Sequence, residues 1–169
     1  MNKLILTFAI STFFLVGYTQ TFKFAHIDSQ ALLDAMPQKD SVMKVLEREY
    51  KQTENILQEM QVEFNKKYQI YLEKQDSLSP SVKKIREQEL MQMQERYENY
   101  KNTASTDLQN REGELFKPIM DKAKKAIEEV AKEQGFLYVF DISAGMILFH
   151  SDKSTDIMPL VKKKLGITK

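Results

Sequence analysis

The segment FDISAGMILFHSDKSTD, near the C-terminus, contains side chains of the types that catalyse hydrolysis. Ser143 or Ser151 would be the nucleophile, His150 the base, and Asp141 or Asp156 the orienting acid. Such a site needs the serine within hydrogen-bond reach of the histidine, which a third group orients. His150 and Ser151 are neighbours at an expected strand end, so their side chains would point to opposite faces. With no G-x-S-x-G elbow present, the sequence argues against a hydrolase and predicts no catalytic residues.

The two histidines of the chain are the other residues that could do chemistry. His26 and His150 both lie at the ends of expected strands and could come close together. A zinc site usually takes three or four ligands, with His or Cys among them, and the chain has no cysteine. We therefore expect two partly exposed histidines at a sheet edge, no metal site and no cofactor.

Residues 1–19 have the pattern of a secretory signal peptide. Lys3 precedes an apolar run over 4–16, and small residues at Gly17 and Thr19 suit cleavage after Thr19. The run of about 13 residues is shorter than the ~20 that span a bilayer. A cleaved signal is therefore favoured over a retained anchor, and we expect no stable membrane insertion after cleavage.

The composition after that cleavage limits the possible partners. Removal of Lys3 leaves 24 basic residues (25 minus one) and 24 acidic residues. A nucleic-acid-binding domain usually carries a basic excess, so no nucleic-acid partner is predicted. Because cysteine is absent, an exported chain of about 150 residues must be held together by packing, by oligomerisation or by both.

Residues 39–112 predict a long antiparallel helical hairpin. The first half lacks Gly and Pro up to the expected tip near 76–80, where Ser79 and Pro80 fit the start of a second helix. Seam positions recur every three or four residues, as in coiled coils. In the first helix they are Leu46, Tyr50, Thr53, Leu57, Met60, Phe64, Lys67 and Tyr71. In the second they are Leu90, Met93, Tyr97, Tyr100, Ala104, Leu108 and Leu115.

Residues 20–38 predict the first part of a separate body. The stretch FKFAHID, residues 22–28, reads as a short strand because of its aromatic and β-branched side chains. Asp28 or Ser29 could cap the helical turn that follows, and Pro37 would end it.

Residues 113–169 predict the rest of the body. An amphipathic helix would end at Gly135, and strands at 136–140 and 146–149 would form a hairpin around a polar turn. Asp156 would cap the last helix. Gly113 and Pro118 interrupt the preceding helical pattern, and proline kinks or breaks a helix, so these two residues are the predicted hinge of the long hairpin.

The three expected strands are too few for a protected sheet, because an isolated sheet leaves open edges. We therefore expect homo-oligomerisation through the body. Its predicted residues are Phe22, Phe24, Ile27, Ile119, Ile127, Val130, Phe136, Tyr138, Phe140, Ile147 and Phe149.

The order of these segments resembles the Skp/OmpH family of periplasmic chaperones. The stretches that carry the resemblance are KPIMDKAKKAIEEVAKEQGF, YVFD, ILFHS and DIMPLVKKKL, between residues 117 and 165. The resemblance covers essentially the whole mature chain. It implies an α+β fold: a small β-barrel-like body whose strands are shared across subunits, with a projecting coiled-coil hairpin on each.

The resemblance implies a homotrimer in the periplasm of a Gram-negative bacterium. It implies an ATP-independent holdase that binds unfolded outer-membrane proteins between the hairpins and prevents their aggregation. The best-known members are strongly basic, whereas residues 39–110 here hold 12 basic and 13 acidic residues. Electrostatic capture of acidic clients and lipopolysaccharide binding therefore do not follow from the resemblance.

Aromatic and methionine side chains on the hairpin are the candidate client-binding residues. Seam packing explains many of them, while off-seam members such as Tyr68 and Met91 could face a client, because thioethers and amphipathic rings suit promiscuous contact. The candidates are Tyr50, Met60, Phe64, Tyr68, Tyr71, Met91, Met93, Tyr97 and Tyr100. The alternative is a structural coiled-coil adaptor of the cell envelope, which would bind one folded partner through the tip near Leu78.

Overall fold

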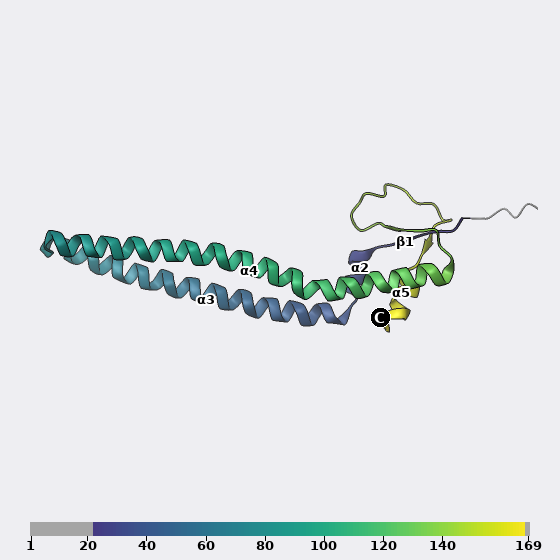
Figure 1. Cartoon of the computed structure of the whole chain (residues 1–169), viewed down its shortest axis with the longest axis horizontal. Coiled ribbons are helices and arrows are strands. Elements are labelled where there is room, and N and C mark those ends of the chain that lie inside the picture. The colour runs from purple at the N-terminus through teal and green to yellow at the C-terminus, as the bar shows by residue number, and fades with distance from the viewer. Residues whose placement is uncertain (1–21, 168–169) are drawn as a thin grey trace, which may run out of the picture.

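The computed structural model describes residues 22–167, in which a small body carries a long helical hairpin (Figure 1). The predicted signal peptide lies outside these residues. The hairpin consists of α3 (Pro37–Lys74), a short 3-10 turn η1 (Gln75–Ser77) and most of α4 (Pro80–Gln134). The body contains the base of α4 together with β1 (Phe24–Ile27), α2 (Ser29–Asp34), β2 (Tyr138–Asp141), β3 (Thr155–Asp156) and α5 (Met158–Leu165).

The sheet has three strands in the order β2-β1-β3, and both pairings are parallel. Phe24 is paired with Tyr138 at one side of β1, and Ala25 with Thr155 at the other. Parallel neighbours need a crossover connection, usually helical. Here the crossover from β1 to β2 is the whole helical hairpin. The predominance of helix beside one small sheet confirms the α+β class.

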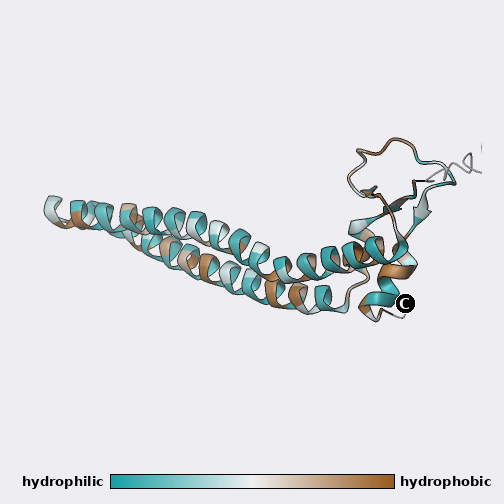
Figure 2. Ribbon diagram, turned by 45° about the vertical axis from the view of Figure 1, so that its right-hand side comes forward, coloured by the Kyte–Doolittle hydropathy of each residue, from teal (hydrophilic) through white to brown (hydrophobic). Residues whose placement is uncertain are grey.

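The predicted strand at 146–149 is wrong. These residues belong to an irregular loop, residues 142–154, and the third strand is β3. Leu148 is 95% exposed and Phe149 is 82% exposed, so most of the surface of these two side chains stays unburied within one subunit. An apolar run forms a strand only where neighbouring strands complete its hydrogen bonds. Figure 2 shows the loop as a largely hydrophobic stretch that stands away from the hairpin.

The hydrophobic core lies where one face of the sheet meets α2, α5 and the base of α4. Ala25 and Ile27 point to this face, as strand alternation requires. They pack with buried residues from the helices. Those residues are Leu32, Met36, Ile119, Ala123, Ala126, Val130, Ile157 and Val161. One compact core thus fixes the base of the hairpin to the sheet.

The helix ends follow the expected capping chemistry. Asp28 caps α2 by accepting a hydrogen bond from the Ala31 N–H, and Ser79 caps α4 by accepting from the Val82 N–H. Gly135 ends α4 with φ 70°, in the left-handed conformation that glycine adopts without strain. Pro37 does not end α2; it is the first residue of α3, where proline is tolerated.

The helix α4 is continuous from the tip to the body and passes through Pro118. Proline removes one helical hydrogen bond, but the core residues that follow Pro118 hold the helix in register. Of the expected kink or break at Pro118, no break occurs, and α4 bends between the tip and the body (Figure 1). One continuous helix consequently belongs to both the hairpin and the body, and the hinge role of Gly113 and Pro118 stays a prediction.

Candidate functional site

The hairpin seam on α3 is built from buried and half-buried residues that face α4. On α3 they are Leu46, Glu49, Thr53, Leu57, Met60, Phe64, Lys67 and Tyr71. The spacing departs from the prediction at one place, where Glu49 occupies the seam and Tyr50 is exposed. Glu49 also forms an ion pair across the seam, because its carboxylate lies 3.6 Å from the guanidinium of Arg111.

The nine candidate client-binding residues fall into three groups. Tyr50, Tyr68 and Met91 are exposed. Five are half-buried along the seam, namely Met60, Phe64, Tyr71, Tyr97 and Tyr100. Met93 is only 5% exposed and is buried between the helices, so its assignment to a client surface is wrong. The partner helix covers part of each apolar seam side chain, so off-seam side chains are the most accessible to a ligand.

A stacked aromatic pair on α3 joins the half-buried seam residue Phe64 to the exposed Tyr68. The rings of Phe64 and Tyr68 are stacked with their centroids 5.9 Å apart and an interplanar angle of 6°. Phe64 also borders a small groove of about 150 Å³ with Met60 and Tyr97. The middle of the hairpin therefore offers separated, shallow apolar contacts.

A larger groove of about 450 Å³ lies near the tip, between the end of α3 and the start of α4. Its apolar and aromatic lining comes from both helices and the turn, namely Ile70, Tyr71, Leu78, Val82 and Leu90. Lys67, Lys74, Arg86 and Glu89 complete it. Of these residues, the sequence pattern predicted a binding role only for Tyr71 and Leu78. The signal that could have revealed the groove is the pair of off-seam aliphatics Ile70 and Val82, both exposed.

A polar network closes the seam beside this groove. Lys67 and Arg86 both pair with Glu89, and their hydrogen bonds lower the pKa of the Glu89 carboxyl. The hydroxyl of Tyr71 donates a 2.6 Å hydrogen bond to Glu87. This hydrogen bond, with some burial and the charge of Glu87, raises the pKa of Tyr71 to about 12. The network holds the two helices together where apolar seam residues are few.

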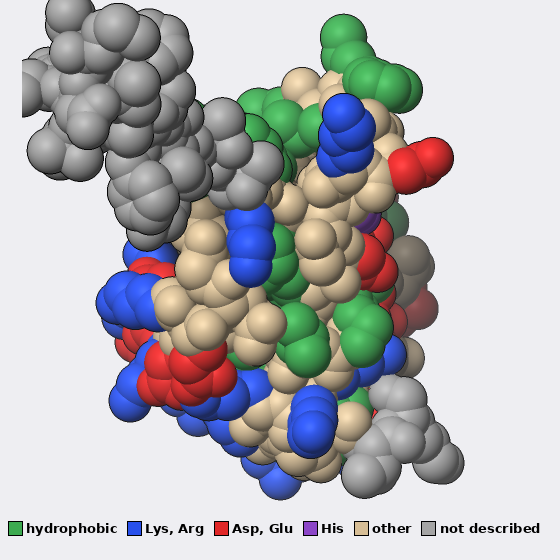
Figure 3. Space-filling model, turned by 90° about the vertical axis from the view of Figure 1, so that its right-hand side faces the viewer, with side chains coloured by type: hydrophobic (Ala, Val, Ile, Leu, Met, Phe, Trp, Pro, Cys, Tyr) green, Lys and Arg blue, Asp and Glu red, His purple; other side chains and the backbone are tan. Residues whose placement is uncertain are grey.

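The outer face of the sheet is aromatic. The ring centroids of Phe24 and Tyr138 lie 6.4 Å apart with nearly parallel planes, and those of Tyr138 and Phe140 lie 6.0 Å apart. All three side chains are exposed. The loop covers part of this face, because Ile147 and Phe149 border a cavity of about 230 Å³ with Phe24 and Phe140. Figure 3 shows exposed hydrophobic side chains at this end of the molecule, among lysines and arginines.

The predicted oligomerisation residues divide between core and surface. Ile27, Ile119 and Val130 are buried within one subunit, so they cannot contribute directly to an interface. Ile127 and Phe136 pack partly against the same core. The surface members are Phe22, Phe24, Tyr138, Phe140 and Phe149, which are exposed, and Ile147, which is half-buried. The sequence pattern identified apolar positions but did not distinguish the two faces.

The two histidines come together, but the expectation of two partly exposed histidines at a sheet edge is wrong. His26 is buried on the central strand β1, and the exposed His150 belongs to the irregular loop. The rings of His26 and His150 stack with centroids 4.0 Å apart, and His26 Nδ1 lies 2.9 Å from the Ser154 hydroxyl. Within residues 22–167 no group of three or more His, Cys, Asp or Glu side chains could hold a metal ion. The contacts join the loop to β1.

Asp141, a proposed catalytic acid, is part of a structural turn. Its carboxylate accepts hydrogen bonds from the Ser29 hydroxyl and N–H and from the Ser143 N–H. It therefore fixes the start of the loop to α2 rather than orienting a histidine. Asp156 likewise accepts from the Met158 N–H at 2.8 Å, at the start of α5. The side chains that suggested hydrolysis serve turns and helix starts.

Comparison with known proteins assigns the family. A sequence model described as "Outer membrane protein (OmpH-like)" matches residues 23–165. The chain belongs to the OmpH-like family. Among curated relatives of this OmpH-like chain, the chaperone protein Skp of Photorhabdus laumondii is 27% identical over 146 residues, 85% of this chain and 88% of that one. The chaperone protein Skp of Pectobacterium atrosepticum is 25% identical over 141 residues, 83% and 86% respectively.

The region of similarity includes both the hairpin and the body of the OmpH-like chain. Within residues 22–167, none of the helices combines the length and the apolar character that a bilayer crossing requires. The long helices are mixed in polarity, with hydrophobic positions spaced along mostly hydrophilic ribbons (Figure 2).

Proposed function

We propose that this OmpH-like protein is an ATP-independent holdase of the Gram-negative periplasm that binds unfolded outer-membrane proteins and prevents their aggregation. The proposal is carried by the long hairpin with exposed Tyr50, Tyr68 and Met91, together with the similarity of 83–85% of the chain to chaperones named Skp. Export would follow from the predicted signal peptide at residues 1–19.

The working form is a homotrimer with the bodies at its centre. Two features of the isolated subunit support self-association. The aromatic face formed by Phe24, Tyr138 and Phe140 is exposed, as are Leu148 and Phe149 of the loop. In addition, β2 and β3 each lie at an edge of the described sheet, and unpaired edges favour strand addition. A closed β-barrel-like body made from strands of several subunits would bury both features.

Clients would be held between the hairpins by many weak contacts. Single exposed aromatic and methionine side chains separated by charges give adaptable apolar contact, while the empty surface stays soluble. Ordering long side chains costs conformational entropy that offsets much of each contact. Because each contact is weak, a bound client can dissociate without nucleotide hydrolysis. A bend of the hairpin at Gly113 and Pro118 would adapt the space to client size.

The test is the suppression of aggregation. A denatured outer-membrane barrel protein is diluted into buffer with the purified protein and no ATP, and light scattering is followed. Suppression is expected at a stoichiometric amount of trimer, and unchanged scattering would refute the holdase. A Tyr50→Ser, Tyr68→Ser and Met91→Ser triple variant should suppress aggregation less well, because it removes exposed apolar contacts while leaving the seam intact. Its helicity and native mass serve as controls.

A further inference from the structure

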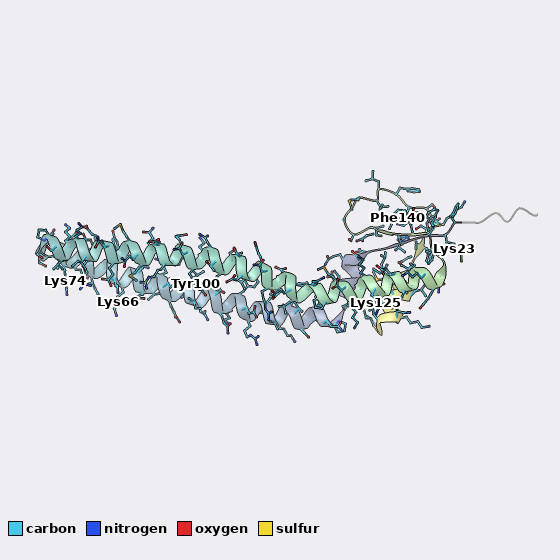
Figure 4. All side chains as sticks on the ribbon, viewed as in Figure 1. Lys23, Lys66, Lys74, Tyr100, Lys125 and Phe140 are labelled. Atoms are coloured by element: carbon cyan, nitrogen blue, oxygen red, sulfur yellow. The ribbon has the colours of Figure 1, made fainter. Side chains whose placement is uncertain are left out.

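The charge of the hairpin is polarised along its length, although its total is nearly zero. Residues 40–63 hold three basic and six acidic side chains, whereas residues 66–86, around the tip, hold six basic and two acidic. Figure 4 shows Lys66 and Lys74 toward the tip and Lys125 in the body. Glu63 and Glu89 pair with Lys67 and Arg86 at the edges of this stretch. The surplus positive charge at the tip is therefore small and is carried by lysines outside these pairs, such as Lys74.

The groove near the tip combines this charge with an apolar floor. Ile70 and Val82 are exposed, and Leu78 and Leu90 are half-buried. The volume of about 450 Å³ lies within the ~300–1,000 Å³ of sites that take small ligands or single large side chains. An exposed apolar hollow of this kind gains free energy when an apolar group displaces water from it.

The cations of the groove differ in how far they are already paired. Lys67 and Arg86 are bound to Glu89, so most of their charge is used inside the hairpin. Lys74, on the last turn of α3, forms no ion pair within the part of the chain that the structure describes. Its ammonium group is the one in this groove that can attract an anion without breaking an existing pair.

We propose that the tip groove binds one large apolar side chain of an unfolded polypeptide next to a carboxylate, which Lys74 attracts. The proposal rests on the proposed holdase function and makes it more specific. The tip would capture the client at apolar–acidic sequences, and the dispersed contacts nearer the body would hold the remainder. The protein would thus select where on a client it first binds.

The experiment uses the full mature protein and a fluorescein-labelled peptide, Gly-Ser-Glu-Phe-Glu-Ser-Gly. Two matched peptides replace Phe with Ala or both Glu with Lys, and fluorescence anisotropy measures the dissociation constants. The Phe-to-Ala peptide should bind at least about fivefold more weakly, since it loses the burial of an aromatic side chain. Raised salt should weaken binding of the acidic peptide, because the charges are exposed.

Charge reversal at matched positions tests the role of Lys74. Lys74→Glu should weaken binding of the acidic peptide about three- to tenfold, since an exposed attraction becomes a repulsion, and should not weaken binding of the Lys-containing peptide. Lys66→Glu makes the same charge change on the same helix but borders a different surface, so it should change binding less than about twofold. Equal weakening by both variants would overturn the proposal, because the effect would then be one of general charge.

Filling the groove gives an independent test. Val82→Trp places a large ring in it and should abolish the difference between the Phe and Ala peptides, with helicity and native mass unchanged. If the Phe and Ala peptides still differ in affinity for this variant, the groove is not the peptide site and the proposal is overturned. The proposal is also overturned if the peptide does not bind in the groove while vesicles containing an anionic lipid, or one folded envelope protein, do bind there.

Aggregation suppression by the same proteins separates this inference from the holdase function. If the wild-type protein suppresses aggregation but its peptide binding ignores Lys74→Glu and Val82→Trp, only the groove assignment fails. If it binds the peptide at the tip but does not suppress aggregation, the holdase proposal fails and the groove assignment stands.

Discussion

Asp141 links α2, β2 and the loop through a single carboxylate. Its burial raises the pKa, but hydrogen bonds from Ser29 and Ser143 together lower it more, so the net pKa lies below the ordinary value. A carboxyl with a lowered pKa in the folded state contributes stability above its unfolded pKa of about 3.9, and this contribution is lost as pH falls through the folded value.

We expect Asp141→Asn to lower the free energy of unfolding at pH 7 by up to about 1 kcal/mol, since the site is exposed and solvent screens the charge. The difference from wild type should shrink as the pH is lowered below about 4. Urea unfolding at pH 7 and pH 3 measures this. Asp152→Asn, at an exposed loop carboxylate, is the control, and an equal effect there would contradict the role of the Asp141 hydrogen bonds.

The hydroxyl of Tyr71 should titrate at a higher pH than an ordinary tyrosine. Its hydroxyl donates to Glu87, and that bond is the main reason that its pKa is raised to about 12. Because the protonated form is stabilised, the contribution is complete below the ordinary tyrosine pKa of about 10 and lost as pH rises through the folded value. Tyr71→Phe should remove the highest-pH step of the tyrosine absorbance titration, and Glu87→Gln should move that step to lower pH. Tyr68→Phe should move the step less than Glu87→Gln does, because Tyr68 is the smallest of the causes that raise the pKa of Tyr71.

At the scale of elements, the long helix α4 contains one glycine at a position that does not require it. A Cβ at Gly113 would meet no atom within 4 Å, and glycine in a helix interior costs about 0.5–1 kcal/mol relative to alanine. Gly113→Ala should therefore stabilise the protein by about this amount, as measured by thermal or urea unfolding.

Gly135 is the matched control, because its φ is 70° and alanine is strained there. Gly135→Ala should destabilise the protein, opposite in sign to Gly113→Ala. If Gly113 acts as a hinge, the stabilised variant should also accommodate a narrower range of client sizes in the aggregation assay. If Gly113→Ala raises the stability but the range of client sizes stays the same, Gly113 only destabilises the helix and its hinge role is refuted.

At the scale of the whole molecule, the exposed aromatic face predicts the oligomer. Phe140→Glu places a charge on the face that self-association would bury, so the variant should be largely monomeric at concentrations where the wild type is a trimer. Light scattering of the native protein measures the mass. Met91→Glu, at a 63% exposed position on the hairpin, should leave the mass unchanged. A wild-type mass of one chain would refute the trimer.

Local patterns predicted the parts of this fold that depend on nearby residues. Ser79 and Pro80 start α4, Gly135 ends it in the left-handed conformation, and most seam positions follow the three- and four-residue spacing. Each of these features is decided within one or two helical turns, where capping and periodicity act. The predicted seam is wrong only at Tyr50. Glu49 lies at the seam instead, and Arg111, with which Glu49 forms an ion pair, comes from a distant part of the chain.

The sequence by itself determined that the chain has two long helices on a small α+β body, and it indicated the family through the stretch from residue 117 to 165. Only the tertiary structure decided that β3 is Thr155–Asp156, that Met93 is buried while Met91 is exposed, and that Lys74 borders an apolar groove. The reason is physical. Helix periodicity is set by neighbours along the chain, whereas burial and strand pairing depend on segments more than a hundred residues apart that meet on β1.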